Sequence, residues 1–112
     1  MKAVYKITFL NLRENVKVEY YFYTDNVKKA LARVPAGKLI EVECLGRDIM
    51  DVVKNSETSP SLYWVYFKDV NATFQHRQFL ANRVEDIIDN LLLQGCEIES
   101  IKIIQTNIEI VE

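Results

Sequence analysis

Residues with catalytic or metal-binding chemistry are few in this chain. Its only histidine, His76, lies between Gln75 and Arg77, and a lone histidine without a nucleophile beside it is more often an exposed or capping residue than a general base. Cys44 and Cys96 lack the close ligand pairs of a zinc site, so we expect both to be buried thiols in a reducing compartment. The three glycines form no cluster that could hold a phosphate. The sequence therefore predicts no catalytic residue, no metal site, no cofactor and no enzymatic activity.

Aromatic side chains are the most informative feature of the chain. Eight of the twelve fall in two short segments, residues 20–23 and 63–67, which read as strands. Consecutive residues of a strand face opposite sides, so one set of alternate aromatics is expected in the core while the other set points outward. We predict that the outward set and its charged neighbours form a partner-binding face that consists of Tyr21, Tyr23, Trp64, Tyr66, Lys17, Lys68, Glu41 and Glu43.

The first part of the chain predicts two strands, a helix and a third strand. Residues 3–10 and 16–24 alternate in the period-two pattern of half-buried strands, and the polar stretch 11–15 can close them as a hairpin. Thr24, Asp25 and Asn26 then offer N-cap oxygens to a helix with apolar residues at the i, i+3, i+4 and i+7 spacing, which Pro35 and Gly37 end. Residues 38–45 alternate again and predict the third strand.

The second part of the chain predicts a further strand, a long helix and a last strand. Residues 48–53 indicate a helical turn, residues 54–61 an exposed loop and residues 62–67 a strand. Apolar residues from Phe79 to Leu92 recur at helical spacing and predict a helix that ends at Gly95, with His76 near its start. Residues 98–105 predict a strand, which Ile108 and Ile110 continue after an interruption.

This element order points to one known architecture. It reads β-β-α-β-β-α-β, and no internal repeat is evident at a fixed period. Without the first strand it becomes β-α-β-β-α-β, the ferredoxin-like split unit, in which an antiparallel sheet carries both helices on one face. We therefore expect a single α+β domain over residues 1–112, ferredoxin-like with an added N-terminal strand. In this order the strands 16–24 and 62–67 lie side by side at the centre of the sheet.

Such a sheet face resembles that of RNA-recognition-motif domains, whose inner strands present aromatic residues that stack on bases. Residues 64–67, Trp-Val-Tyr-Phe, follow the aromatic–Val–x–aromatic end of the family's third-strand signature. Residues 60–63 supply neither the basic residue nor the glycine that begin it. The resemblance implies a base-stacking role for Trp64.

Charge is divided unevenly along the chain. The net charge of -2 combines +5 over residues 1–38 with -7 over residues 39–112. We expect neighbouring strands to interleave the two sets, because protein surfaces usually mix both signs. A pI near 5.5, with Glu41 and Glu43 beside the aromatic residues, disfavours nucleic acid, since phosphate neutralisation supplies most of the affinity in such complexes.

Binding of a partner protein, or of a second copy in a homodimer, through the aromatic face is the function that the sequence favours. We expect a cytoplasmic protein with no membrane partner, because no run approaches roughly 18 apolar residues and residues 1–6 lack the pattern of a signal peptide. Three alternatives stay open: single-stranded nucleic acid on the same face, an accessory inhibitor of the phage or mobile-element kind whose acids mimic nucleic acid, and an aromatic face that is covered or only stabilises the sheet.

Overall fold

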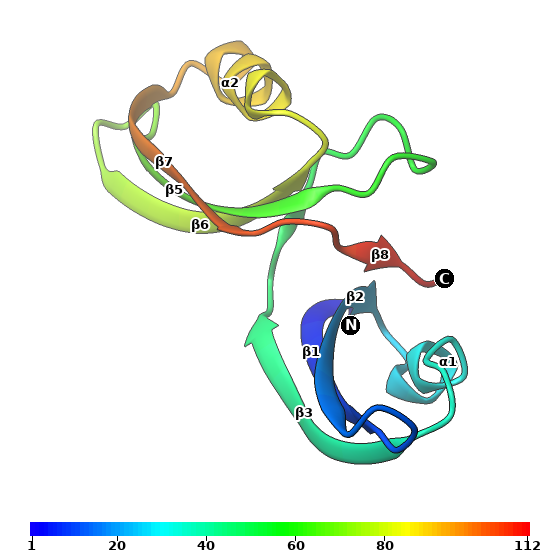
Figure 1. The fold of residues 1–112 in the computed structure, drawn as a ribbon. Helices are drawn as coiled ribbons and strands as arrows, with labels where there is room; N and C mark the ends of the chain where they lie inside the picture. Colours follow the sequence, from blue (N-terminus) through cyan, green and yellow to red (C-terminus); the bar gives the residue numbers. More distant parts are fainter. The chain divides into compact units, whose positions relative to one another are not determined.

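The computed structural model describes all 112 residues, and they divide into two compact units (Figure 1). Unit 1 comprises residues 1–48 and 108–112, and unit 2 comprises residues 49–107. Each unit holds one helix and a four-stranded mixed sheet, which confirms the predicted α+β class. The single antiparallel sheet of a ferredoxin-like domain is not formed, because the strands pair in two separate sheets. A single domain over residues 1–112 stays a prediction. No helix of the structure is long and apolar enough to cross a membrane.

Unit 1 is built on an antiparallel hairpin. Its elements are β1 (Ala3–Asn11), β2 (Val16–Thr24), α1 (Val27–Leu31), β3 (Lys38–Gly46) and β8 (Glu109–Ile110). Strand β1 lies between β2 and β3 and is antiparallel to both, while β8 lies parallel to β2, so the strand order is β3-β1-β2-β8. Ile7, Phe22, Ala30 and Val111 form a buried cluster between the sheet and α1.

Polar side chains fix the turns of unit 1 as the sequence predicts. Asn11 Oδ1 accepts hydrogen bonds from two backbone N–H groups of the hairpin turn, at 3.0 and 3.3 Å. Asn15 takes the left-handed conformation with φ of 56°, which asparagine tolerates better than most residues. Asn26 caps α1, because its side chain accepts from two backbone N–H groups of the first turn, at 3.1 and 3.4 Å. The predicted hairpin and N-cap are both confirmed.

Unit 2 has the same kind of sheet with a longer helix. Its elements are β4 (Met50–Asp51), β5 (Ser61–Lys68), β6 (Phe74–Ala81), α2 (Val84–Leu93) and β7 (Glu97–Gln105). Strand β5 lies between β6 and β7 and is antiparallel to both, while β4 lies parallel to β6, so the strand order is β4-β6-β5-β7. Helix α2 covers one face of this sheet (Figure 1), and Val65 and Phe79 of the strands belong to one buried cluster with Ile87 and Leu91 of the helix.

Helix α2 ends in a Schellman motif at the glycine that the sequence predicts. The N–H groups of Gly95 and Cys96 donate to the carbonyl oxygens of Leu92 and Leu91, each at 3.0 Å. Gly95 has a φ of 74°, and a Cβ added there would lie 3.1 Å from Val70 Cγ1. Both the backbone conformation and the close neighbour therefore favour glycine at this position.

Two elements of unit 2 differ from the prediction. Residues 74–81 form strand β6, so His76 lies on a strand and not near the start of a helix. Phe79 and Leu80 pair with β5 but continue the apolar spacing of α2, which is why periodicity alone extends the helix too far toward its N-terminus. The helical turn expected at residues 48–53 is also wrong, because residues 50–51 form β4 and pair with β6.

The two units repeat one another element by element. Unit 1 begins β1-β2-α1-β3 and unit 2 contains β5-β6-α2-β7, and in both the first strand lies between the second and the third. A two-residue strand then follows each third strand, β4 after β3 and β8 after β7. Corresponding elements begin 57 to 59 residues apart. The chain is therefore an internal repeat at the level of structure.

The repeat extends to the pairing of individual residues. The ladder between β1 and β3 shifts register after Val4 and after Thr8, and the ladder between β5 and β7 shifts after the corresponding Leu62 and Tyr66. The repeat escapes a search at one fixed period because the separation of corresponding residues changes along the unit and most surface positions differ.

Candidate functional site

The predicted partner-binding face is divided between the two units. Strand β2 belongs to the sheet of unit 1 and β5 to the sheet of unit 2, so the expected shared face at one sheet centre is wrong. The physical reason is that each of these strands pairs with the other strand of its own hairpin and with the strand that follows the next helix. Unit 1 carries Lys17, Tyr21, Tyr23, Glu41 and Glu43, and unit 2 carries Trp64, Tyr66 and Lys68.

In unit 1, Tyr21 belongs to a polar cluster with Glu19 and Lys6. Its hydroxyl donates to Glu19 Oε2 at 2.8 Å, and Glu19 Oε1 lies 3.2 Å from Lys6 Nζ. The hydrogen bonds from Tyr21 and Lys6 lower the pKa of Glu19, and the hydrogen bond to Glu19 raises the pKa of Lys6. Burial and then the bond to Glu19 raise the pKa of the Tyr21 hydroxyl. These three groups satisfy one another, so they leave few free polar groups for a partner.

Tyr23, expected to point outward, is buried. Only 5% of its surface is exposed, and Lys2 Nζ lies 5.6 Å from the centroid of its ring. Lys17, Glu41 and Glu43 are exposed. Tyr23 therefore contributes to the packing of unit 1 and not to an outer face.

Folding interleaves the charges that the sequence separates. In unit 1, Lys2 Nζ lies 3.3 Å from Glu112 Oε1, and Arg33 Nη1 lies 3.4 Å from Glu109 Oε2. Unit 1 holds nine basic and eight acidic residues, and unit 2 holds five basic and eight acidic residues. The net charge is thus +1 for unit 1 and -3 for unit 2. These two charges differ less than the +5 and -7 of the two segments of the sequence, as expected.

On unit 2, side chains of β5 and β6 form what we call the aromatic cluster: Trp64, Tyr66, Phe74 and His76. Tyr66 faces His76 directly across the antiparallel pair. The ring centroids of Trp64 and His76 are 5.2 Å apart, those of Trp64 and Tyr66 5.9 Å, and those of Tyr66 and His76 6.0 Å. By strand alternation these rings lie on the face of the sheet opposite α2. The rings of Trp64, Tyr66 and His76 contact one another, and Phe74 lies two residues before His76 on the same face of β6.

The aromatic cluster is partly accessible, with Trp64 half-buried and the other three side chains exposed, and it has two lysines at its borders. The exposed fractions are 69% for Phe74 and 40% for Tyr66. Lys68 Nζ lies 4.9 Å from the centroid of the Phe74 ring, a cation–π contact. Lys102 faces Trp64 across the pair of β5 and β7. A ligand at this face would meet aromatic rings and positive charge together.

Unit 1 shows what the fold itself requires at these positions. The strand registers place polar or charged residues of unit 1 at the four positions of the aromatic cluster: Lys6 for Trp64, Thr8 for Tyr66, Lys17 for Phe74 and Glu19 for His76. Core positions keep their character, since Tyr5 opposite Phe22 corresponds to Tyr63 opposite Phe79. Aromatic residues at these four positions are therefore not needed to build this sheet, although unit 1 carries Tyr21 at the neighbouring position that Gln78 occupies in unit 2.

Two of the four residues of the aromatic cluster are predicted by the sequence. The sequence predicts Trp64 and Tyr66 on the outer face because β5 alternates clearly. It does not assign Phe74 to that face, and it places His76 near the start of a helix. The period-two pattern of β6 is weak, because Gln75 and Arg77 leave its inner positions polar until Phe79.

A second cluster of charged groups lies at the start of α2. Asp86 is only 3% exposed, and its Oδ1 lies 3.5 Å from Lys54 Nζ and 3.7 Å from Arg83 Nη2 without accepting a hydrogen bond. Asn82 fixes the adjoining loop through four hydrogen bonds. The cavity there measures about 320 Å³ and is lined by Lys54, Asn55, Thr58, Asn82, Arg83 and Asp86. The charges of Lys54 and Arg83 exceed that of Asp86, so the cluster keeps a net positive charge.

The remaining observations add no candidate site. No group of three or more His, Cys, Asp or Glu side chains is placed to hold a metal ion. Comparison with protein-family models, with curated proteins and with solved structures finds no match. The residues and the geometry of the chain are therefore the basis for a functional proposal.

Proposed function

We propose that the protein is a binding module that contacts a partner protein through the aromatic cluster of unit 2. The observation that carries the proposal is the internal comparison, because unit 1 builds the same sheet with polar residues at those four positions. Exposed Trp and Tyr side chains dominate binding hot spots, since they bury a large area and lose few rotamers. The protein is taken to act without catalysis and in the cytoplasm, as expected from the sequence.

The charges around the aromatic cluster indicate the chemistry of the partner. Lys68 and Lys102 border it, and the carboxylate that faces Lys68 in register is Glu97. Other acids of unit 2, such as Glu85 and Asp89, belong to α2 on the opposite side of the sheet. Since Glu97 faces Lys68, the partner that fits this surface best presents apolar side chains to the rings and a carboxylate to Lys102.

Single-stranded nucleic acid is a second candidate, favoured by one finding. Glu41 and Glu43, whose charges disfavour nucleic acid in the sequence analysis, belong to the sheet of unit 1, whereas Trp64 belongs to the sheet of unit 2. Exposed rings can stack on bases, and Lys68 and Lys102 can contact phosphates. Two lysines on a unit of net charge -3 offer little phosphate neutralisation, so a protein partner ranks first.

Mimicry of nucleic acid has less support. The thirteen acids after residue 38 are distributed over both units. Five of them hold turns, ion pairs or a buried position in the fold: Asp51, Asp69, Asp86, Glu109 and Glu112. Acids with such structural roles are less free to imitate a row of phosphates.

The test of the proposal exchanges residues between corresponding positions. Trp64→Lys/Tyr66→Thr introduces the side chains that unit 1 carries there, so we expect this variant to fold. Immobilised wild-type protein should retain a partner from an extract of the source cells, and the variant should lose it. Tyr21→Gln, which gives unit 1 the residue that unit 2 has at Gln78, is the matched control and should retain the partner. Retention by all three proteins would contradict the proposal.

Two further measurements separate the alternatives. Sedimentation velocity over a dilution series shows whether the partner is a second copy bound through the aromatic cluster, because Trp64→Lys/Tyr66→Thr would then shift the protein to monomer. Titration of single-stranded oligonucleotides is followed by the fluorescence of Trp64, the only tryptophan. Tight binding that weakens steeply with salt and is lost in Trp64→Ala would favour nucleic acid instead.

A further inference from the structure

The cavity of about 320 Å³ at the start of α2 combines a buried carboxylate with two accessible cations. Lys54 lines it from the loop that follows β4, and Arg83 and Asp86 line it from the start of the helix. The side chains of Lys54 and Arg83 are exposed, whereas Asp86 is 3% exposed. The three groups carry a net charge of +1, so the cavity attracts an anion.

The buried carboxylate of Asp86 lacks a hydrogen-bond donor. Its Oδ1 is buried and accepts no hydrogen bond, although Lys54 Nζ lies 3.5 Å and Arg83 Nη2 lies 3.7 Å away. Buried polar atoms are nearly always hydrogen-bonded, and one without a partner is costly. Because Asp86 lines the cavity, a ligand that brings an O–H or N–H group into it would satisfy this oxygen.

Unit 1 closes the corresponding end of its own helix with a side chain. Asn26 accepts hydrogen bonds there from the backbone N–H groups of Lys28 and Lys29. In unit 2 the position of Asn26 is taken by Arg83, which makes no side-chain cap, and that of Lys29 is taken by Asp86. The end of α2 therefore lacks the cap that unit 1 has, and a helix N-terminus favours negative charge.

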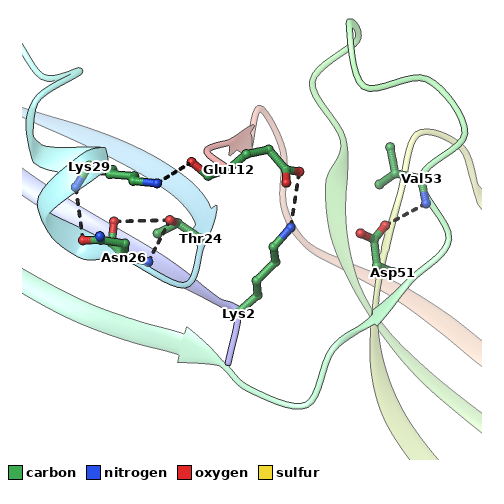
Figure 2. A network of polar contacts seen from close by, with 7 residues as sticks. All are labelled: Lys2, Thr24, Asn26, Lys29, Asp51, Val53 and Glu112. Atoms are coloured by element: carbon green, nitrogen blue, oxygen red, sulfur yellow. Dashed lines mark hydrogen bonds and ion pairs between the residues drawn. The ribbon is translucent and has the colours of Figure 1, made fainter.

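The backbone around Lys54 is fixed by hydrogen bonds that do not involve the cavity's charged groups. Asp51 Oδ1 accepts from the Val53 N–H at 3.0 Å (Figure 2). Asn82 Oδ1 accepts from the N–H groups of Lys54 and Asn55, at 3.0 and 2.9 Å. Asn82 Nδ2 donates back to the Asn55 carbonyl at 2.9 Å. The wall of the cavity is thus preorganised, which lowers the entropy cost of binding.

We propose that this cavity binds inorganic phosphate, an anion that keeps at least one proton at neutral pH. Its negative oxygens would lie against Lys54, Arg83 and the N-terminus of α2, and its hydroxyl group would donate to Asp86 Oδ1. Sulfate has the same shape but no proton at neutral pH, so sulfate and Asp86 would meet with acceptors only. A zwitterion such as glycine offers a donor but no net charge to match the +1 of the cluster. The site is separate from the aromatic cluster, which lies on the face of the sheet opposite α2.

Titration of the isotope-labelled full chain, followed by NMR at constant ionic strength, tests the proposal. The probes are sodium phosphate, sodium sulfate, glycine and glycerol phosphate. At about pH 7.5 the monoester has mostly lost its second proton, because its second pKa is about 6, whereas inorganic phosphate still carries one. We expect phosphate to shift the amide signals of residues 54–58 and 82–86 and to bind about ten-fold or more tightly than the other three probes.

Four results of this titration would overturn the proposal. Absence of phosphate binding would leave the cavity without the ligand that it is proposed to hold. Equal affinity for sulfate would show an unselective anion site. Glycerol phosphate binding as tightly as inorganic phosphate would show that the proton is not required, and tighter binding of glycine would show a site for a zwitterion.

Asp86→Asn separates a role in selecting the ligand from a role in the fold alone. The amide keeps the shape of the side chain, removes its charge and adds a donor. We therefore expect sulfate to bind more tightly to this variant and the preference for phosphate over sulfate to disappear. An unchanged preference would contradict the proposal, because a merely structural Asp86 would not affect it.

Lys54→Met/Arg83→Met removes both cations and should lose phosphate binding. Arg13→Met/Lys28→Met is the matched control, since it removes two exposed cations of unit 1 and gives the same net charge. This control should bind phosphate as the wild type does, and an equal loss in both variants would contradict the proposal by showing attraction to net charge alone. Should Lys54→Met/Arg83→Met fail to fold, the selectivity of Asp86→Asn still decides.

Discussion

Glu19 links the stability of unit 1 to pH through its contacts with Tyr21 and Lys6. Because those hydrogen bonds lower its folded-state pKa, its contribution to stability is present above the unfolded pKa of about 4.5 and is lost as pH falls through the folded-state pKa. The raised pKa of Lys6 acts in the opposite range, since its contribution is present below the unfolded pKa of 10.5 and is lost as pH rises above it. Glu19→Gln should therefore flatten the acid side of a plot of melting temperature against pH. Glu14→Gln, at an exposed residue of the hairpin turn, is the control, and an identical profile for both variants would count against this reading.

Asp86 depends on two exposed cations for its charge balance. Lys54→Met/Arg83→Met should lower the free energy of unfolding by about 1–2 kcal/mol, because a buried carboxylate loses both ion pairs while the exposed partners limit the effect. Adding Asp86→Asn in the same background should restore part of that loss, and chemical denaturation measures both. No recovery with Asp86→Asn would show that the cations stabilise the protein in another way.

At the scale of elements, the sequence predicts what is local and misses what is not. The Asn26 cap, the hairpin at 11–15 and the outward direction of Trp64 follow from neighbouring residues and are confirmed. Strand β4 has only two residues and exists because β6 lies beside it, so no local pattern marks it. Which strands share a sheet depends on pairing between distant segments, and there the sequence placed β2 beside β5 wrongly.

The C-terminus of α2 offers a test of one such local signal. Gly95→Ala forces a side chain into a conformation with φ of 74° and toward Val70 Cγ1 at 3.1 Å, so we expect the free energy of unfolding to fall by about 1–2 kcal/mol. Val70→Ala in the same background removes the close contact but not the backbone strain, and should recover only part of the loss in a thermal or chemical denaturation. Full recovery would assign the whole effect to the contact.

At the scale of the whole molecule, neither half of the sequence contains a complete unit. Strand β4 precedes the exposed loop 54–59 but belongs to the sheet of unit 2, and β8 follows that loop but belongs to the sheet of unit 1. A protease site introduced at Ser56 and Glu57 should let the folded chain be cut without separating its pieces, which should elute together in size-exclusion chromatography until denaturant is added. Separation under native conditions would show that the short strands contribute little.

The proposed function requires a binding surface on unit 2 that unit 1 lacks. Quenching of Trp64 fluorescence by acrylamide tests it most directly, because this only tryptophan lies in the aromatic cluster. We expect the quenching constant to fall several-fold when the captured partner is bound, and we expect Tyr21→Gln to leave this change intact. An unchanged quenching constant in the complex would show that the partner binds elsewhere and would contradict the proposed function.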